Sequence, residues 1–235
     1  MDTASEVIVT RPLPGVALLE HSDPGARQAN IATNTYVVVN ANRQALLIDG
    51  SFDYLVAPLR SVLSEGYDLI AVALTHRHLA HGGAVRRIAE SFGVPVLLHP
   101  RDAASLHHGT PGLGFDDPMH SDVLATFGLE TVFFPGHTEG SVMFYGASDG
   151  VLFTGDAAMG PSRDQAATGI ERLLRPPFSF NTDDAQLRRG WAEFDRSLRH
   201  VLPFHGSLYT GRSAEEIRRI IQPLQRQEPT RGMTG

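Results

Sequence analysis

The chain has 235 residues, a formal net charge of −6 at pH 7, eleven His and no Cys. All 20 basic residues are Arg, because the sequence contains no Lys. The lack of Cys excludes disulfides, thiolate nucleophiles and Cys-held metal sites, and the lack of Lys excludes Schiff-base chemistry and a phosphate-loop lysine. The acidic balance argues against a nucleic-acid groove. No apolar run approaches the roughly 18 residues that a membrane span requires.

The first hundred residues predict strands that alternate with helices. Two segments, 54–65 and 81–92, are expected to be helical, and the first of them ends at Gly66. Helices between strands indicate crossover units, so part of the sheet is expected to be parallel. Six segments have the apolar or alternating pattern of strands: residues 7–10, 15–21, 35–39, 45–48, 69–74 and 96–98.

The rest of the chain predicts a second group of strands and two further helices. Two stretches without periodicity, residues 99–122 and 157–182, are interpreted as long loops. One helix is expected from Asp183 or Asp184 to about residue 199, and another from the capping box at Ser213 to about residue 227. The tail from about residue 228 is expected to fray, and residues 1–235 to form a single domain. The predicted strands are residues 130–134, 142–145 and 151–154, with a short apolar run at 201–203.

Three His residues follow the buried strand 69–74 in the pattern H-x-H-x-x-H: His76, His78 and His81. Residues i and i+2 of an extended segment point to the same side, so His76 and His78 can bind one ion. His81 stands where the chain turns into a helix and can reach a neighbouring position. Histidine is the commonest metal-binding side chain, but this spacing also arises by chance. A metal site therefore needs further ligands.

Three other segments place a His or an Asp beside Gly at the end of a strand. Ligands collect at the carboxyl ends of strands in an open sheet, and Gly beside a ligand lets the backbone turn sharply. We therefore expect these residues to join the first three His in one metal site. They are His137 after strand 130–134, Asp156 after strand 151–154 and His205 after the run 201–203.

The order and spacing of these segments resemble the metallo-β-lactamase-fold superfamily. In that family a strand is followed by H-x-H-x-D-H, then by G-H-T-x-G-S, a later G-D and a late G-H-G. The corresponding segments are 76–81, 136–141, 155–156 and 204–206, the last reading Phe204-His205-Gly206. The resemblance covers about residues 15–210. It implies an α/β fold, a four-layer αβ/βα sandwich with a metal site at one edge.

The resemblance also implies roles for individual residues. Asp49, at the end of strand 45–48, resembles the family Asp that supports a metal-binding His from behind. A water or hydroxide between the two metals would be the nucleophile, positioned by Asp156. The implied ligands are His76, His78 and His137 for the first metal, and His81, His205 and the bridging Asp156 for the second.

Position 80 departs from the family pattern, because Ala80 stands where the family has a metal-binding Asp. The second position keeps two His and one carboxylate, which is still a three-ligand set. It nevertheless lacks one negative charge, so we predict that one zinc binds tightly and a second binds weakly or not at all. Glu139 follows His137 by two residues and could return the missing carboxylate, although a solvated loop Glu is the simpler interpretation.

These residues predict a metal-dependent hydrolase in which a metal-activated water attacks a small-molecule ester, thioester, lactone or amide. A second hypothesis is a mono-iron oxygenase resembling persulfide dioxygenases, with His76, His137 and Asp156 as a facial triad. A third is a non-enzymatic protein with a degenerate metal site. The first residues carry no export signal. We therefore expect a cytoplasmic protein, alone or as a homo-oligomer, with a small-molecule substrate and no nucleic-acid or membrane partner.

Overall fold

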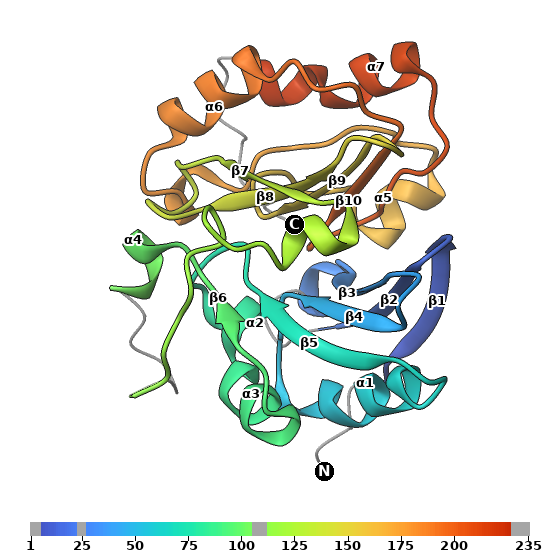
Figure 1. Ribbon diagram of the computed structural model, residues 1–235. Helices are drawn as coiled ribbons and strands as arrows, with labels where there is room; N and C mark the ends of the chain where they lie inside the picture. The colour runs from blue at the N-terminus through green and yellow to red at the C-terminus, as the bar shows by residue number, and fades with distance from the viewer. Residues whose placement is uncertain (1–5, 23–26, 105–111, 227–235) are drawn as a thin grey trace.

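Two β-sheets pack face to face in the computed structural model, which describes residues 6–22, 27–104 and 112–226. Helices cover the outer face of each sheet, so the described residues form four layers (Figure 1). This arrangement confirms the predicted four-layer α/β sandwich. That residues 1–235 form a single domain stays a prediction.

The first sheet is formed by the amino-terminal part of the chain and has the strand order β1-β2-β3-β4-β5-β6. Strands β1 to β4 are antiparallel neighbours, whereas β4, β5 and β6 run parallel. Parallel neighbours need crossover connections, which here contain α1 (Val56–Leu63) and α3 (Val85–Phe92). The strands are β1 (Ile8–Leu13), β2 (Val16–His21), β3 (Thr33–Val39), β4 (Gln44–Ile48), β5 (Asp68–Ala73) and β6 (Val96–Leu97).

The second sheet has the strand order β10-β9-β8-β7. Strands β7, β8 and β9 are antiparallel neighbours, and β10 lies parallel to β9. Its outer face is covered by α6 (Asp184–Glu193) and α7 (Ala214–Gln225), which lie at the top of Figure 1. The strands are β7 (Glu130–Phe133), β8 (Val142–Gly146), β9 (Val151–Gly155) and β10 (His200–Pro203).

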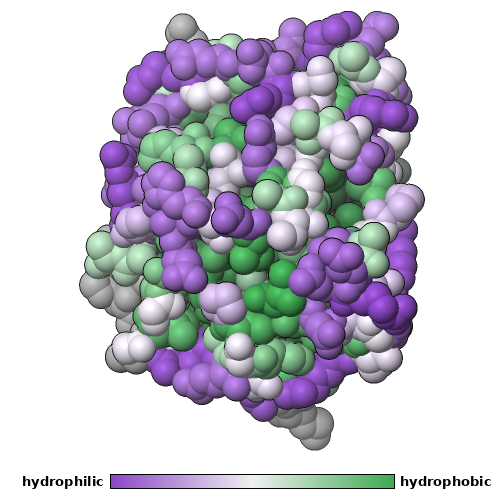
Figure 2. Space-filling view, viewed as in Figure 1, coloured by the Kyte–Doolittle hydropathy of each residue, from purple (hydrophilic) through white to green (hydrophobic). Residues whose placement is uncertain are grey.

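Alternating side chains along the strands produce the layers, because successive strand residues face opposite sides of a sheet. In β4, Leu46 and Ile48 enter the core between the sheets, and Leu47 packs in the core that includes α1 and α3 residues. In β8, Phe144 enters the core between the sheets, and Met143 packs in the core that includes α6 and α7 residues. Hydrophilic residues cover the α6 and α7 layer from outside, and apolar residues show below it (Figure 2).

Several short elements complete the described chain. Two of the short α-helices lie in stretches predicted to be loops: α4 (Pro100–Ala103) in 99–122, and α5 (Arg163–Ala167) in 157–182. The signal for α5 was present in the sequence, because Ser162 and Gln165 form a capping box. Within the described ranges, no helix combines the length and apolarity that crossing a bilayer requires. The other short elements are α2 (Leu79–Gly82) and the 3-10 helices η1 (Arg27–Ala29), η2 (Asp53–Leu55), η3 (Leu124–Phe127) and η4 (Phe178–Phe180).

The predicted helix over 81–92 is wrong in its first turn, because the chain forms α2 and α3 with a break between them. The His81 carbonyl oxygen accepts hydrogen bonds from Gly50 N at 2.6 Å and Ser51 N at 2.9 Å. Ala84 N donates to the Ser51 carbonyl oxygen at 2.6 Å. Contacts with the segment after β4 therefore replace the bonds that a continuous helix would make.

The predicted helix from 183 or 184 to 199 is also too long, because α6 ends at Glu193. Phe194 is extended, and its ring contacts those of Phe134 and Trp191. Aromatic packing thus ends the helix one turn and a half early. The last helix is described to Gln225, and the predicted frayed tail lies outside the described residues.

Candidate metal centre

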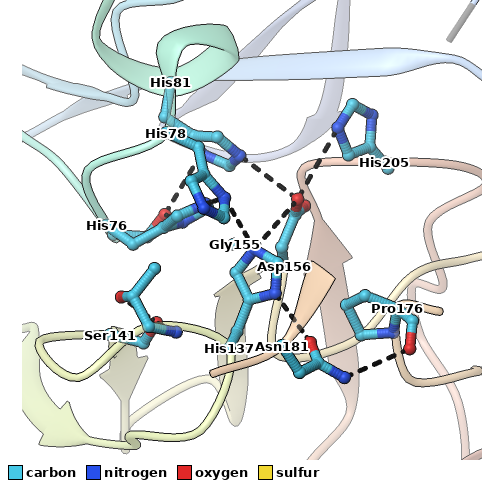
Figure 3. A network of polar contacts seen from close by, with 12 residues as sticks. His76, His78, His81, His137, Ser141, Gly155, Asp156, Pro176, Asn181 and His205 are labelled. Atoms are coloured by element: carbon cyan, nitrogen blue, oxygen red, sulfur yellow. Dashed lines mark hydrogen bonds and ion pairs between the residues drawn. The ribbon is translucent and has the colours of Figure 1, made fainter. Parts of the chain in front are cut away.

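Four segments carry the predicted ligands, and each of them follows a strand. Residues 75–81 follow β5, residues 134–141 join β7 to β8, and Asp156 and His205 follow β9 and β10. Val142 N donates to the Thr75 carbonyl oxygen at 2.9 Å, which joins the end of β5 to the start of β8. The six predicted side chains converge in this region (Figure 3).

The first cluster consists of His76, His78 and His137. His78 Nδ1 lies 3.0 Å from His76 Nε2 and 3.0 Å from His137 Nε2. A tetrahedral zinc ion binds imidazole nitrogens at about 2.0–2.1 Å, which puts two ligand nitrogens roughly 3.3 Å apart. The nitrogen spacing in the first cluster is therefore close to the spacing in a zinc site.

The imidazoles of the first cluster are neutral at pH 7. Burial, together with the neighbouring His81, holds the pKa of His76 well below its ordinary value. Burial and His137 lower the pKa of His78 to about 4. Burial also lowers the pKa of His137, against the opposing effect of Asp156. A neutral imidazole offers a lone pair, so the three side chains have the protonation state that metal binding requires.

Asn181 determines which nitrogen of His137 faces the first cluster. Its amide nitrogen donates to Asp184 Oδ1 at 2.9 Å and to the Pro176 carbonyl oxygen at 3.3 Å. The amide oxygen therefore faces His137 and accepts a hydrogen bond from Nδ1 at 2.8 Å (Figure 3). With its proton on Nδ1, His137 turns the Nε2 lone pair toward His78. Nothing in the sequence indicates this contact beyond the length of the loop that holds Asn181.

The second cluster consists of His81, Asp156 and His205. Asp156 Oδ2 lies 3.5 Å from His81 Nε2 and 3.7 Å from His205 Nε2. The same oxygen lies 3.7 Å from His137 Nε2, so Asp156 links the second cluster to the first (Figure 3). Burial raises the pKa of the Asp156 carboxyl, but His205 and His81 outweigh burial and hold it well below its usual range. Asp156 is therefore a carboxylate at neutral pH.

Asp49 lies directly behind His81, on the side away from Asp156. Its Oδ2 is 3.0 Å from His81 Nδ1, and its Oδ1 accepts a hydrogen bond from Thr75 N at 2.9 Å. Burial lowers the pKa of His81, but Asp49 and Asp156 outweigh burial and raise it to about 9. Asp49 has a φ of 60°, a left-handed conformation that non-Gly residues seldom adopt and that is frequent at functional sites.

Ala80 and Glu139 mark the departure from the family pattern. Ala80 is half-buried in α2 and has no side-chain donor atom. Glu139 is 53% exposed, and its carboxylate pairs with the Arg77 guanidinium. That ion pair engages Glu139 elsewhere, so no contact supports the idea that it replaces the missing Asp.

The donor atoms fit a bound metal ion. In the first cluster, three imidazole nitrogens face one another at 3.0 Å, a spacing at which either a proton on His78 Nδ1 or a bound cation can lie between their lone pairs. In the second cluster, Asp156 Oδ1 is buried without a hydrogen bond among the described residues, and His81 Nε2 has an ion-pair contact with Asp156 Oδ2 at 3.5 Å. An unsatisfied buried polar atom costs about 1–3 kcal/mol. A bound cation would accept the facing lone pairs of the first cluster and give a carboxylate oxygen of this kind a partner.

Two relatives have similar sequences and names that describe hydrolases. A probable metallo-hydrolase of Bacillus subtilis (strain 168), YqgX, is 27% identical over 173 residues, which cover 63% of this chain and 81% of the relative. A hydroxyacylglutathione hydrolase of Methylobacillus flagellatus is 32% identical over 171 residues, which cover 67% of this chain and 64% of the relative.

The fold is also that of solved metallo-beta-lactamases. The structure of DIM-1 metallo-beta-lactamase superposes with a TM-score of 0.72 at 13% identity, covering 94% of this chain and 95% of that one. The family model described as the metallo-beta-lactamase superfamily matches residues 30–200. This range includes every residue of the two clusters except His205. The chain therefore belongs to the metallo-beta-lactamase superfamily.

Proposed function

We propose that this chain is a metal-dependent hydrolase that binds zinc in the first cluster. The observation that carries the proposal is the spacing of three neutral imidazole nitrogens, His76 Nε2, His78 Nδ1 and His137 Nε2, at one edge of the sandwich. Asp156 Oδ2 lies 3.7 Å from the last of these atoms and adds a carboxylate beside the site. We further propose that the protein is cytoplasmic and acts on a small molecule.

The side chains divide the catalytic work. A divalent ion held by the first cluster would supply Lewis acidity and lower the pKa of a water to about 7. Asp156, ionised at neutral pH, would accept a hydrogen bond from the attacking water at Oδ2 and orient it. The Asn181 amide oxygen holds the proton on His137 Nδ1 and so keeps Nε2 available. Asp49 holds the other end of His81 through Nδ1.

The second cluster is proposed to bind a second zinc more weakly. It has one carboxylate, Asp156, because Ala80 contributes no donor atom. It also contains His81, whose pKa of about 9 means that a proton must leave before Nε2 can bind a cation. Both features weaken metal binding relative to the first cluster.

The proposed substrate is a small ester, thioester, lactone or amide. The Methylobacillus relative is named for hydrolysis of a hydroxyacylglutathione, which belongs to the thioester class. This similarity places a thioester first among the bonds to be tested.

A hydrolysis panel with zinc-loaded protein tests the proposal. The chain has no Cys, so a thiol reagent detects thioester cleavage without background from the protein. We expect hydrolysis of at least one of the four bond classes and its loss in His78→Ala. His200→Ala is the matched control, because His200 begins β10 at the end opposite His205. Zinc-loaded protein that hydrolyses none of the four classes would contradict the proposal and favour the non-enzymatic hypothesis.

An iron oxygenase is the second candidate, and one donor set favours it. His76, His81 and Asp156 each have a donor atom within 4.8 Å of the other two. Two His and one carboxylate are the ligands of non-haem Fe(II) oxygenases. The grouping differs from the predicted triad, because His81 stands in place of His137. Oxygen consumption by the Fe(II)-loaded protein, without hydrolysis by the zinc-loaded protein, would favour this candidate.

A further inference from the structure

Asp102 is a buried carboxylate outside both clusters. It lies in the short helix α4, after β6, and its side chain is fully buried. Four hydrogen bonds reach its two oxygens. Oδ1 accepts from Gly140 N at 2.8 Å and from the Arg77 guanidinium at 2.9 Å. Oδ2 accepts from Arg77 N at 2.9 Å and from Thr138 Oγ1 at 2.7 Å.

These donors come from the two segments that carry the first cluster. Arg77 stands between His76 and His78, and its backbone N–H and its guanidinium both bond to Asp102. Thr138 directly follows His137 and donates through its hydroxyl. One carboxylate therefore joins the His76–His78 segment to the segment that begins at His137. The ring contacts between the two segments depend on this spacing.

The space around Asp102 is shaped to the carboxylate. A Cβ atom at Gly140 would lie 2.7 Å from Asp102 Oδ1 and 2.7 Å from its Cγ. Glycine at this position lets the backbone N–H approach the carboxylate closely enough to donate. The Arg77 guanidinium supplies the positive charge that a buried carboxylate requires.

We infer that Asp102 is a positioning residue for the first cluster, holding the His76–His78 segment and His137 at metal-binding distance before a metal arrives. The inference rests on the proposed function only in that the first cluster binds a metal. It does not depend on which bond, if any, the protein hydrolyses.

Asp102→Asn is the informative variant, because an amide has nearly the same shape as a carboxylate. Each carboxylate oxygen accepts from two donors, so the amide nitrogen would face at least one N–H group to which it cannot bond, and the Arg77 guanidinium would lose its buried negative partner. Removal of a group that orients metal ligands typically weakens metal affinity about 10- to 100-fold. We expect a loss of this size in the zinc affinity of the tightest site.

The experiment measures zinc affinity by competition with a chromophoric chelator and records the absorption spectrum of the cobalt-substituted protein. Asn40→Ala is the control, since the Asn40 side chain also makes four hydrogen bonds, three within the turn between β3 and β4 and one to the Thr126 carbonyl oxygen. We expect both variants to unfold at lower temperature. Only Asp102→Asn should lose zinc affinity and change the cobalt spectrum.

Two outcomes would overturn the inference, and a third separates it from the proposed function. Unchanged zinc affinity and cobalt spectrum in folded Asp102→Asn would overturn it and leave Asp102 a purely structural group. If that variant does not fold, Thr138→Val removes one donor to Oδ2 and should weaken zinc binding several-fold, and unchanged affinity there would overturn the inference equally. A wild-type protein that binds zinc but hydrolyses nothing would contradict the proposed function and leave the Asp102 result standing.

Discussion

The two ligand clusters share one edge of the sandwich but are built differently. The first cluster has three neutral imidazoles whose facing nitrogens lie 3.0 Å apart. The second has a single carboxylate, Asp156, with its imidazole nitrogens 3.5 Å and 3.7 Å away. One cluster is preformed around a space for a cation, and the other is held together by its own charges.

The difference lies in what stands behind the ligands. Asn181 leaves the Nε2 lone pair of His137 facing the first cluster, because its amide oxygen accepts a hydrogen bond from the Nδ1–H group. Asp49 has the opposite effect on His81 in the metal-free protein, since its negative charge helps to hold an extra proton on that ring. A neutral partner such as Asn181 leaves the imidazole ready to bind a metal. A charged partner such as Asp49 stabilises the protonated imidazole, which must lose a proton before it can bind a metal.

Asn181→Ala is expected to have the largest effect and would sharpen the comparison. Without the amide oxygen, His137 can place its proton on Nε2 and rotate away from His78. We expect zinc affinity at the first cluster to fall about 10- to 100-fold, measured by chelator competition. The second cluster should be unaffected, because Asn181 contacts only His137 among the ligands in the interactions described. Equal weakening at both sites would show that the clusters are not independent.

Ala80→Asp tests the weakness of the second cluster directly. The variant returns a carboxylate to the position where the family has a metal-binding Asp, and we expect the second zinc to bind about tenfold more tightly, equivalent to about 1.4 kcal/mol. Equilibrium dialysis at buffered free zinc, followed by elemental analysis, gives the number of ions per chain. Wild type should hold one ion at low free zinc, and the variant close to two. Two ions in the wild type under these conditions would contradict the proposed difference between the clusters.

The convergence of the six candidate ligands, with Asp49 behind His81, was predictable from the sequence and its family resemblance, whereas Asp102 and Asn181 were not. His137, Asp156 and His205 follow strands beside Gly, a pattern that depends on local sequence alone. Asp102 and Asn181 lie in segments without periodicity, and their partners are distant in sequence, 25 to 38 residues for Asp102 and 44 for Asn181 and His137. Such contacts arise only when segments that are far apart in the sequence pack together.

The same limit explains the errors in the helices. The break between α2 and α3 depends on hydrogen bonds from residues 50 and 51 to the His81 carbonyl oxygen. The early end of α6 depends on Phe194 contacting the ring of Phe134, which lies 60 residues earlier in the sequence. Local periodicity carries neither signal, so sequence predicts that these helices exist and misplaces their ends.

The smallest expected effect is the pH dependence of the metal-free protein, in which the clusters oppose each other. His78, whose pKa falls to about 4, stabilises the fold above the unfolded value of about 6.5 and loses that contribution as pH falls toward 4. His81, whose pKa rises to about 9, stabilises the fold below about 6.5 and loses that contribution as pH rises through 9. The midpoint temperature of unfolding, measured in chelator, should therefore be highest near pH 6.5 and fall by a few degrees at pH 9. A loss of about 1 kcal/mol lowers the midpoint of a chain this size by roughly 2–4 °C. His81→Gln should remove the alkaline decline and keep the acid one, and an alkaline decline of undiminished size in that variant would show that other groups produce it.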